Sequence, residues 1–177
     1  MRIYLSLLFI LIASVVFGQK FTTEQSSVSF YSHAAVEDIS AKNTATTSIF
    51  NSATGEIVFS IPVTDFVFEK SLMQEHFNEK YLETETYPKS TFKGKIIGFN
   101  ESATGEQQVK AQGKLTLHGV TKDIEVSGTA VMKSTKLVLK SKFIIVLEDY
   151  NVKRPKFAWQ NIAEQVEVTV EFTYKPL

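Results

Sequence analysis

The 177-residue sequence contains no cysteine and only four prolines. Without cysteine the chain can form neither a disulfide nor a thiolate metal site, and no thiol can act as a nucleophile or carry a lipid anchor. An excess of charge is missing too, because nineteen Lys and Arg residues balance nineteen Asp and Glu residues. A chain without a basic excess has no long-range field to attract nucleic acid, so nucleic-acid binding is set aside.

Catalytic motifs are missing from the sequence as well. No Gly-x-Ser-x-Gly element, phosphate-binding loop or dinucleotide fingerprint occurs, and the acidic residues are scattered. Zinc sites often use three histidines, but His33, His76 and His118 lack the close spacing of a metal motif. We therefore expect no enzyme, no metal site and no cofactor. A metal-dependent enzyme built on these three histidines is the least favoured alternative.

The one long apolar run lies at the N-terminus. Arg2 precedes an almost wholly apolar stretch over residues 3–17, and Gly18 follows it. This pattern is typical of a secretory signal peptide, since roughly 15 apolar residues fall short of the ~20 that span a bilayer. We predict a signal peptide over residues 1–19 and one domain over 20–177. The mature protein is expected to be periplasmic or secreted, with no stable membrane anchor.

Phenylalanine is the commonest aromatic residue, with fourteen copies against six tyrosines and one tryptophan. Many copies lie where apolar and polar residues alternate, which is the period of a strand with one buried face. The clearest such segment runs from Val166 to Tyr174. Another, Lys114–Leu117, is followed by His118-Gly119, and this pair predicts a tight hairpin turn.

Three further segments carry local predictions. Ser52–Glu56 repeats as Ser102–Glu106, which predicts two hairpin loops with a left-handed glycine rather than a duplicated half-domain. The alternation of residues 57–61 continues past Pro62 to Phe68, which predicts one long strand bent at the proline. Residues 143–147 are apolar on both faces, which predicts a strand end buried on both sides.

Residues 70–81 break the strand pattern. Leu72 and His76, like Met73 and Phe77, stand one helical turn apart, which predicts a single short amphipathic helix. About seven to nine strands joined by short turns predict an all-β antiparallel fold. Closure into a barrel is favoured because a long open edge would promote association, and a two-sheet sandwich is the alternative.

Two elements in this order resemble a known family: Tyr87-Pro88-Lys89-Ser90-Thr91-Phe92, and the stretch from Gly113 to Lys122 that reads GKLTLHGVTK. With the first strand ending at His33 and the helical His76-Phe77-Asn78, the chain resembles the YceI-like domain over about residues 20–175. The resemblance implies an extended eight-stranded antiparallel β-barrel of lipocalin-like build. It also implies a long isoprenoid or similar amphiphile in the lumen of a periplasmic or secreted bacterial protein.

One segment departs from the family pattern. Many relatives have an arginine-aspartate-aromatic-glycine element before the last strand, where this chain has Asp149–Pro155. The shape of the mouth and the identity of the ligand are therefore not carried over from the family.

The leading hypothesis is a carrier that holds a long-chain isoprenoid or other lipid inside the barrel. The alternative is an interaction or stress-response module whose barrel is filled by its own side chains, and pairing into a homodimer stays open. The helix and the loop with Phe157 and Trp159 are expected to flank the mouth. The candidate ligand-binding residues, on the apolar wall and at the mouth, are Phe30, Phe59, Phe66, Phe68, Leu72, Met73, His76, Phe77, Phe92, Leu115, Leu117, Phe143, Trp159, Val168, Val170 and Phe172.

Overall fold

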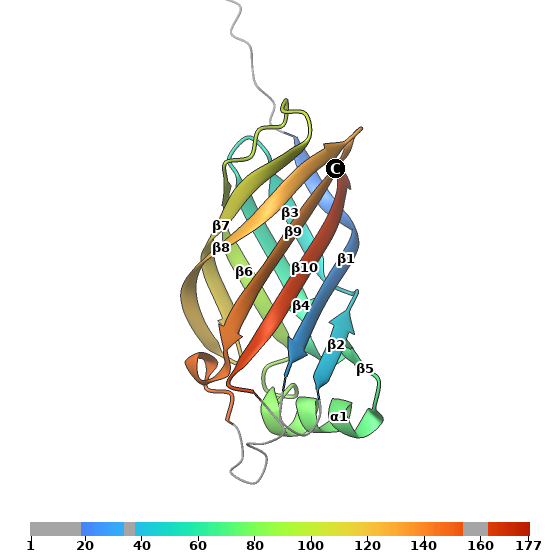
Figure 1. Ribbon diagram of the computed structural model, residues 1–177, viewed down its shortest axis with the longest axis vertical. Helices are drawn as coiled ribbons and strands as arrows, with labels where there is room; N and C mark the ends of the chain where they lie inside the picture. The colour runs from blue at the N-terminus through green and yellow to red at the C-terminus, as the bar shows by residue number, and fades with distance from the viewer. Residues whose placement is uncertain (1–18, 34–37, 154–162) are drawn as a thin grey trace, which may run out of the picture.

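The computed structural model describes residues 19–33, 38–153 and 163–177 (Figure 1). They form a closed antiparallel barrel of eight strands. Pairing of β10 with β1, in which Val28 lies opposite Val170, closes the ring. The predicted barrel is thus confirmed, and closure excludes the two-sheet sandwich. The barrel strands are β1 (Lys20–Ser32), β3 (Thr47–Asn51), β4 (Glu56–Pro62), β6 (Lys89–Ile97), β7 (Glu106–Leu117), β8 (Val120–Lys133), β9 (Lys136–Val146) and β10 (Gln165–Pro176).

Two short strands extend the sheet at one end. β2 (Ile39–Asn43) pairs with the last residues of β1, and β5 (Val67–Phe68) pairs with β2. The predicted single strand bent at Pro62 is therefore wrong. A 3-10 turn, η1 (Val63–Asp65), follows Pro62, and the chain then crosses to a new partner strand. A proline at a strand end and a short turn after it together stop the β4 ladder.

A helix lies between β5 and β6. The α-helical turn α1 (Ser71–His76) runs directly into a π-helical turn, η2 (Phe77–Tyr81). Figure 1 shows α1 lying across one end of the barrel, with the C-terminus at the other end. The predicted short amphipathic helix is confirmed. The described part of the chain holds no helix long and apolar enough to cross a bilayer.

The predicted turns are confirmed by their backbone angles. His118 and Gly119 have φ of 49° and 74° and form the two-residue connection between β7 and β8. Two left-handed residues in succession are what a type I′ hairpin turn requires. Gly55 and Gly105, the fourth residues of the two copies of the repeated pentapeptide, have φ of 73° and 86°. Each lies in a loop between neighbouring antiparallel strands, so the repeat reflects turn geometry.

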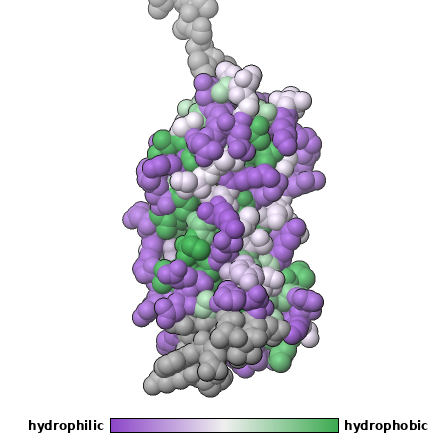
Figure 2. Space-filling model, viewed as in Figure 1, coloured by the Kyte–Doolittle hydropathy of each residue, from purple (hydrophilic) through white to green (hydrophobic). Residues whose placement is uncertain are grey.

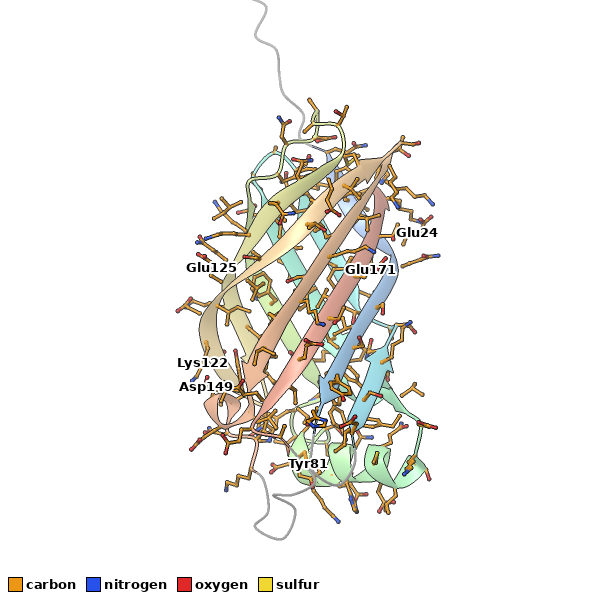
Figure 3. All side chains as sticks on the ribbon, in the orientation of Figure 1. Glu24, Tyr81, Lys122, Glu125, Asp149 and Glu171 are labelled. Carbon is orange, nitrogen blue, oxygen red and sulfur yellow. The ribbon has the colours of Figure 1, made fainter. Side chains whose placement is uncertain are left out.

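The outer wall of the barrel is polar, and Figure 2 shows it as mostly hydrophilic with scattered hydrophobic patches. Lysines pair with carboxylates across neighbouring strands; Lys140 Nζ, for example, lies 3.1 Å from Glu171 Oε2 (Figure 3). The predicted two-sided burial near the end of β9 is wrong, because Ile144 is 53% exposed on this outer wall. The strand there is covered on its inner face only.

The barrel end opposite the helix is packed with aromatic side chains. Phe21, Phe50 and Tyr174 are each 0% exposed, and the Phe50 ring contacts those of Phe21, Tyr174 and Phe99 at centroid distances of 5.5–6.4 Å. We call Phe21, Phe50, Phe99 and Tyr174 the aromatic plug. The Tyr174 hydroxyl lies 2.7 Å from Ser48 Oγ, and Ser48 Oγ itself donates to the Val58 carbonyl. Tyr174 therefore donates to Ser48, and the one polar group in the plug is satisfied.

Candidate ligand-binding cavity

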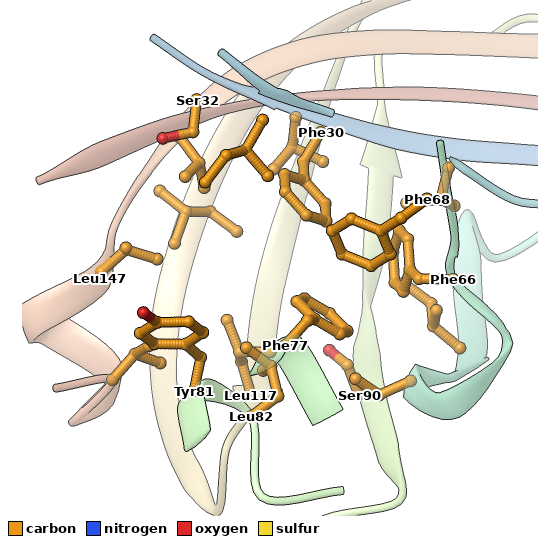
Figure 4. A pocket seen from close by; sticks show the side chains of 18 of the residues that line it. Phe30, Ser32, Phe66, Phe68, Phe77, Tyr81, Leu82, Ser90, Leu117 and Leu147 are labelled. Atoms are coloured by element: carbon orange, nitrogen blue, oxygen red, sulfur yellow. The ribbon is translucent and has the colours of Figure 1, made fainter. Parts of the chain in front are cut away.

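The barrel is hollow at the end that carries α1. A cavity of about 550 Å³ lies between the inner faces of the strands and the helix. Figure 4 shows side chains converging on it from β1, β6, β7, the β5 region and η2. The volume falls within the ~300–1,000 Å³ typical of small-molecule sites. Almost all of the lining is aliphatic or aromatic.

Most of the predicted site residues come together in this wall. Phe92 and Phe172 do not line the cavity, and Trp159 lies outside the described residues. Their contact with a ligand stays a prediction. The predicted residues that line the cavity are Phe30, Phe59, Phe66, Phe68, Leu72, Met73, His76, Phe77, Leu115, Leu117, Phe143, Val168 and Val170.

Phe92 and Phe172 lie in the packed core next to the cavity. Phe92 stacks on Phe59 with 5.1 Å between ring centroids, and Phe172 contacts Phe59 at 5.7 Å. Phe172 in turn contacts Tyr174 of the aromatic plug at 5.9 Å. A continuous run of rings therefore fills the barrel from the plug to Phe59, which forms the inner limit of the hollow part.

A cluster of four phenylalanines attaches the helix to the barrel. The Phe77 ring, at the start of η2, stacks on Phe30 of β1 with centroids 5.6 Å apart and planes 15° apart. It also contacts Phe68 at 4.9 Å and Phe66 at 5.6 Å. Aromatic pairs add roughly 0.5–1.5 kcal/mol each beyond the area they bury. Phe77 thus fixes the helix while its own ring forms part of the cavity wall.

The π-helical turn directs the following residues inward as well. The backbone N–H of Leu82 donates to the Phe77 carbonyl, 2.9 Å away and five residues earlier. A turn of this width is rare and is often found at functional sites. Tyr81 and Leu82 both line the cavity. Burial raises the pKa of the Tyr81 phenol above its usual value.

His118, which follows the cavity residue Leu117, links three segments of the chain. Its Nδ1 lies 3.1 Å from the Tyr150 carbonyl in η3 (Leu147–Tyr150), and a carbonyl can only accept, so Nδ1 carries the hydrogen. Its ring meets that of Tyr87 edge-on at 4.6 Å. The buried Nε2 has no hydrogen-bond partner among the described residues and lies 3.9 Å from Glu83 Oε1. The imidazole therefore joins the β7–β8 turn, η3 and the η2–β6 connection.

The three histidines do not form a metal site. His33 Nδ1 pairs with Asp38 Oδ1 at 2.7 Å on the outside of the barrel, His76 lines the cavity and His118 is held by Tyr150. In the ranges that the structure describes, no three His, Asp or Glu side chains are grouped so that they could hold a metal ion.

Comparison with protein-family models matches residues 20–174 to the YceI-like domain. The chain belongs to the YceI-like family. A comparison with curated proteins finds no match. Solved structures share the barrel of this YceI-like chain at low sequence identity, so they show the fold and no more.

Three such structures span most of the YceI-like chain. A polyisoprenoid-binding domain from Saccharophagus degradans is 17% identical, with a TM-score of 0.76 over 89% of this chain and 98% of its own. BcnA from Burkholderia cenocepacia is 18% identical, with a TM-score of 0.70 over 84% of this chain and 95% of its own. The Campylobacter jejuni YCEI protein is 15% identical, with a TM-score of 0.63 over 80% and 86%.

Several wall residues of the YceI-like barrel were not among the predicted ones. Val28, Ile145 and Val166 face inward like the predicted residues on the same strands. The alternation of each strand could therefore have identified them. Ser32 and Ser90 are polar residues in buried positions, and nothing in their local sequence indicates an apolar cavity. The lining residues that sequence reasoning missed are Val28, Ser32, Ile39, Ile61, Val63, Lys70, Tyr81, Leu82, Ser90, Ile145, Leu147, Val152 and Val166.

Proposed function

We propose that this protein is a carrier that holds one long isoprenoid or other apolar lipid chain in the barrel cavity. The observation that carries the proposal is the cavity of about 550 Å³, lined almost wholly by apolar side chains, in a barrel that is otherwise packed with aromatic rings. A cavity of this kind binds apolar ligands because water gains little from filling it.

The energetics fit a ligand recognised by its hydrocarbon rather than by a polar motif. Each methylene moved from water into an apolar site contributes roughly 0.8 kcal/mol, so a long chain can bind tightly without charged contacts. The relative from Saccharophagus degradans is named as a polyisoprenoid-binding domain, and that name supports the same class of ligand here.

The alternative function, a side-chain-filled barrel that serves only as an interaction module, is less favoured. It requires the inner face near α1 to be packed as the aromatic plug is, and the cavity lies there instead. We further propose that the carrier is periplasmic or secreted. The composition of residues 1–19 supports export, because one basic residue precedes an apolar run that ends in small and polar residues.

Native mass spectrometry of the protein purified from its own host tests both parts of the proposal. We expect a mass that lacks about the first nineteen residues and carries one apolar molecule, which organic extraction then releases for identification. An apo mass that does not change after incubation with long isoprenoids would contradict the carrier function. Retention of residues 1–19 in the mature protein would contradict the cleaved signal peptide.

A further inference from the structure

Five lining side chains of the cavity carry hydrogen-bonding groups: Ser32, Lys70, His76, Tyr81 and Ser90. Around Phe59 and Val170, deep in the barrel, the wall is apolar. In Figure 4 the hydroxyls of Ser32 and Tyr81 lie on one side of the cavity, and that of Ser90 lies across from them near Phe77. A ligand that fills the cavity therefore meets hydrocarbon along most of its length and only a few polar groups.

Two of these hydroxyls already have partners within the chain. Ser90 Oγ donates to the Thr116 carbonyl at 2.9 Å, and Ser32 Oγ accepts from the Ala163 backbone N–H at 3.3 Å. The Tyr81 hydroxyl differs, because it has no hydrogen bond to any described residue. Burial raises the pKa of Tyr81, so the group stays a neutral O–H donor at any physiological pH.

The Tyr81 hydroxyl lies on one side of the cavity. In Figure 4 it lies on the same side of the cavity as the Ser32 hydroxyl, near Leu147, while the rings of Phe66 and Phe68 lie on the opposite side. The hydroxyl is not fully buried, so an acceptor that enters the cavity can reach its O–H.

We propose that Tyr81 donates a hydrogen bond to an oxygen at one end of the bound molecule, so that the ligand is an amphiphile with a hydroxyl or carbonyl head at Tyr81. Its apolar chain then runs toward Phe59. This inference rests on the proposed carrier function and adds the chemistry of the head group and the direction in which the ligand lies.

Competition between matched ligands tests the inference on the lipid-stripped mature protein. Geranylgeraniol and its parent hydrocarbon are offered together, and native mass spectrometry gives the ratio of the two bound forms. We compare this ratio in the wild type, in Tyr81→Phe and in Tyr87→Phe, where the ring of the control packs on His118 outside the cavity. Because Tyr81→Phe removes one hydrogen bond to the alcohol, we expect the bound alcohol-to-hydrocarbon ratio to fall about three- to tenfold in this variant. We expect no change in the ratio for Tyr87→Phe.

The outcomes separate this inference from the function on which it rests. Equal ratios in wild type and Tyr81→Phe, with both ligands bound, would overturn the Tyr81 contact and leave the carrier function standing. Failure of all three proteins to bind either ligand would instead contradict the carrier function itself. The methyl ether of geranylgeraniol gives a readout on the wild type alone. It keeps the acceptor oxygen, so we expect it to compete as the alcohol does, and competition no better than the hydrocarbon would overturn the donor role of Tyr81.

Discussion

Gly119 has a φ of 74° in the β7–β8 turn and faces the Tyr87 ring, which a side chain at this position would reach. A Cβ on Gly119 would lie 2.5 Å from Tyr87 Cε1, closer than any real contact. Gly105 has a similar φ of 86°, but a Cβ there would have no neighbouring atom within 4 Å. Alanine substitutions at these two glycines therefore separate the cost of left-handed backbone strain from the cost of steric crowding.

Gly119→Ala is therefore expected to destabilise the protein by about 2 kcal/mol, of which about half is left-handed backbone strain and the rest displacement of Tyr87. Gly105→Ala carries the strain alone and is expected to cost about 1 kcal/mol. Urea unfolding of both variants measures the difference. Equal losses would show that displacing the Tyr87 ring costs no stability.

Ionisation of Tyr174 makes the stability of the barrel fall as the pH rises in the alkaline range. Its pKa is raised far above the usual value of 10 because burial disfavours the charged phenolate. A raised pKa means that the folded state keeps the phenol proton while the unfolded chain releases it. The contribution of the protonated Tyr174 to the free energy of unfolding is fully present below pH 10. It is lost as the pH rises above 10, by up to about 1.4 kcal/mol per pH unit.

We expect Tyr174→Phe to lower the free energy of unfolding at neutral pH by about 1 kcal/mol, the worth of one hydrogen bond. The same variant should lose less stability than the wild type between pH 10 and pH 12, because it has no phenol to ionise at this position. Unfolding midpoints measured across that range test the sign. Parallel pH curves for the two proteins would show that Tyr174 does not govern the alkaline limb.

At the scale of elements, Phe77 makes the ring contacts that attach the helix to the barrel, and Met73 and Tyr81 also pack against the core. Phe77 packs among Phe30, Phe66 and Phe68, whereas Leu72 on the same helix is 60% exposed. Phe77→Ala is expected to cost about 3 kcal/mol, since it removes a ring from an aromatic cluster, and Leu72→Ala at most about 0.5 kcal/mol.

Hydrogen exchange of the α1 and η2 amides distinguishes detachment of the helix from general destabilisation. We expect Phe77→Ala to speed exchange in these amides more than in β9 and β10, because the strands keep their ladders. Exchange that rises equally in helix and strands would contradict the role of Phe77 as a local anchor.

The elements show how far the sequence predicts this structure. Alternation from Val166 to Tyr174 gives the buried face of β10 correctly, because a two-residue period leaves one choice of face. The same signal fails between Pro62 and Phe68, where both phenylalanines are buried but the chain has changed partner strand. Alternation records which side chains are covered, and it does not record which strand pairs with which.

The cavity itself was less predictable than its wall. Apolar residues such as Phe59 and Phe92 follow the same pattern, yet Phe59 lines the cavity and Phe92 is 2% exposed behind it. Whether an inward side chain meets a neighbour or a void depends on barrel geometry and on the helix across its end. Tyr81 was missed for the same reason, since only the π-helical turn, which places Tyr81 in the cavity wall, gives its hydroxyl a role.

At the scale of the whole molecule, the barrel divides into a plugged half and a hollow half. The plugged half is built from fully buried rings such as Phe50 and Tyr174, which hold the strands together whether or not a ligand is present. Near α1 the same strands carry inward side chains that leave space. The division allows one end of a small barrel to stay stable while the other end accommodates a guest.

Neighbouring residues of β9 provide a test of this division. Ile145 lines the cavity, and Ile144 is 53% exposed on the outer wall. Ile145→Trp adds an indole to the hollow half, where it takes space from the ligand without crowding a packed core. Exclusion of about two ligand methylenes should weaken lipid binding roughly tenfold. Ile144→Trp adds the same ring to the outside and should bind lipid as the wild type does.

The two introduced tryptophans also report where they lie, against the emission of Trp159, which both variants share. Emission from Ile145→Trp should shift to shorter wavelength than that from Ile144→Trp, because the inner indole is removed from water. Lipid retained per protein molecule, quantified after organic extraction, gives the binding readout, and thermal unfolding checks that both variants fold. If both variants fold and retain lipid equally, the ligand does not occupy the hollow half of the barrel beside β9.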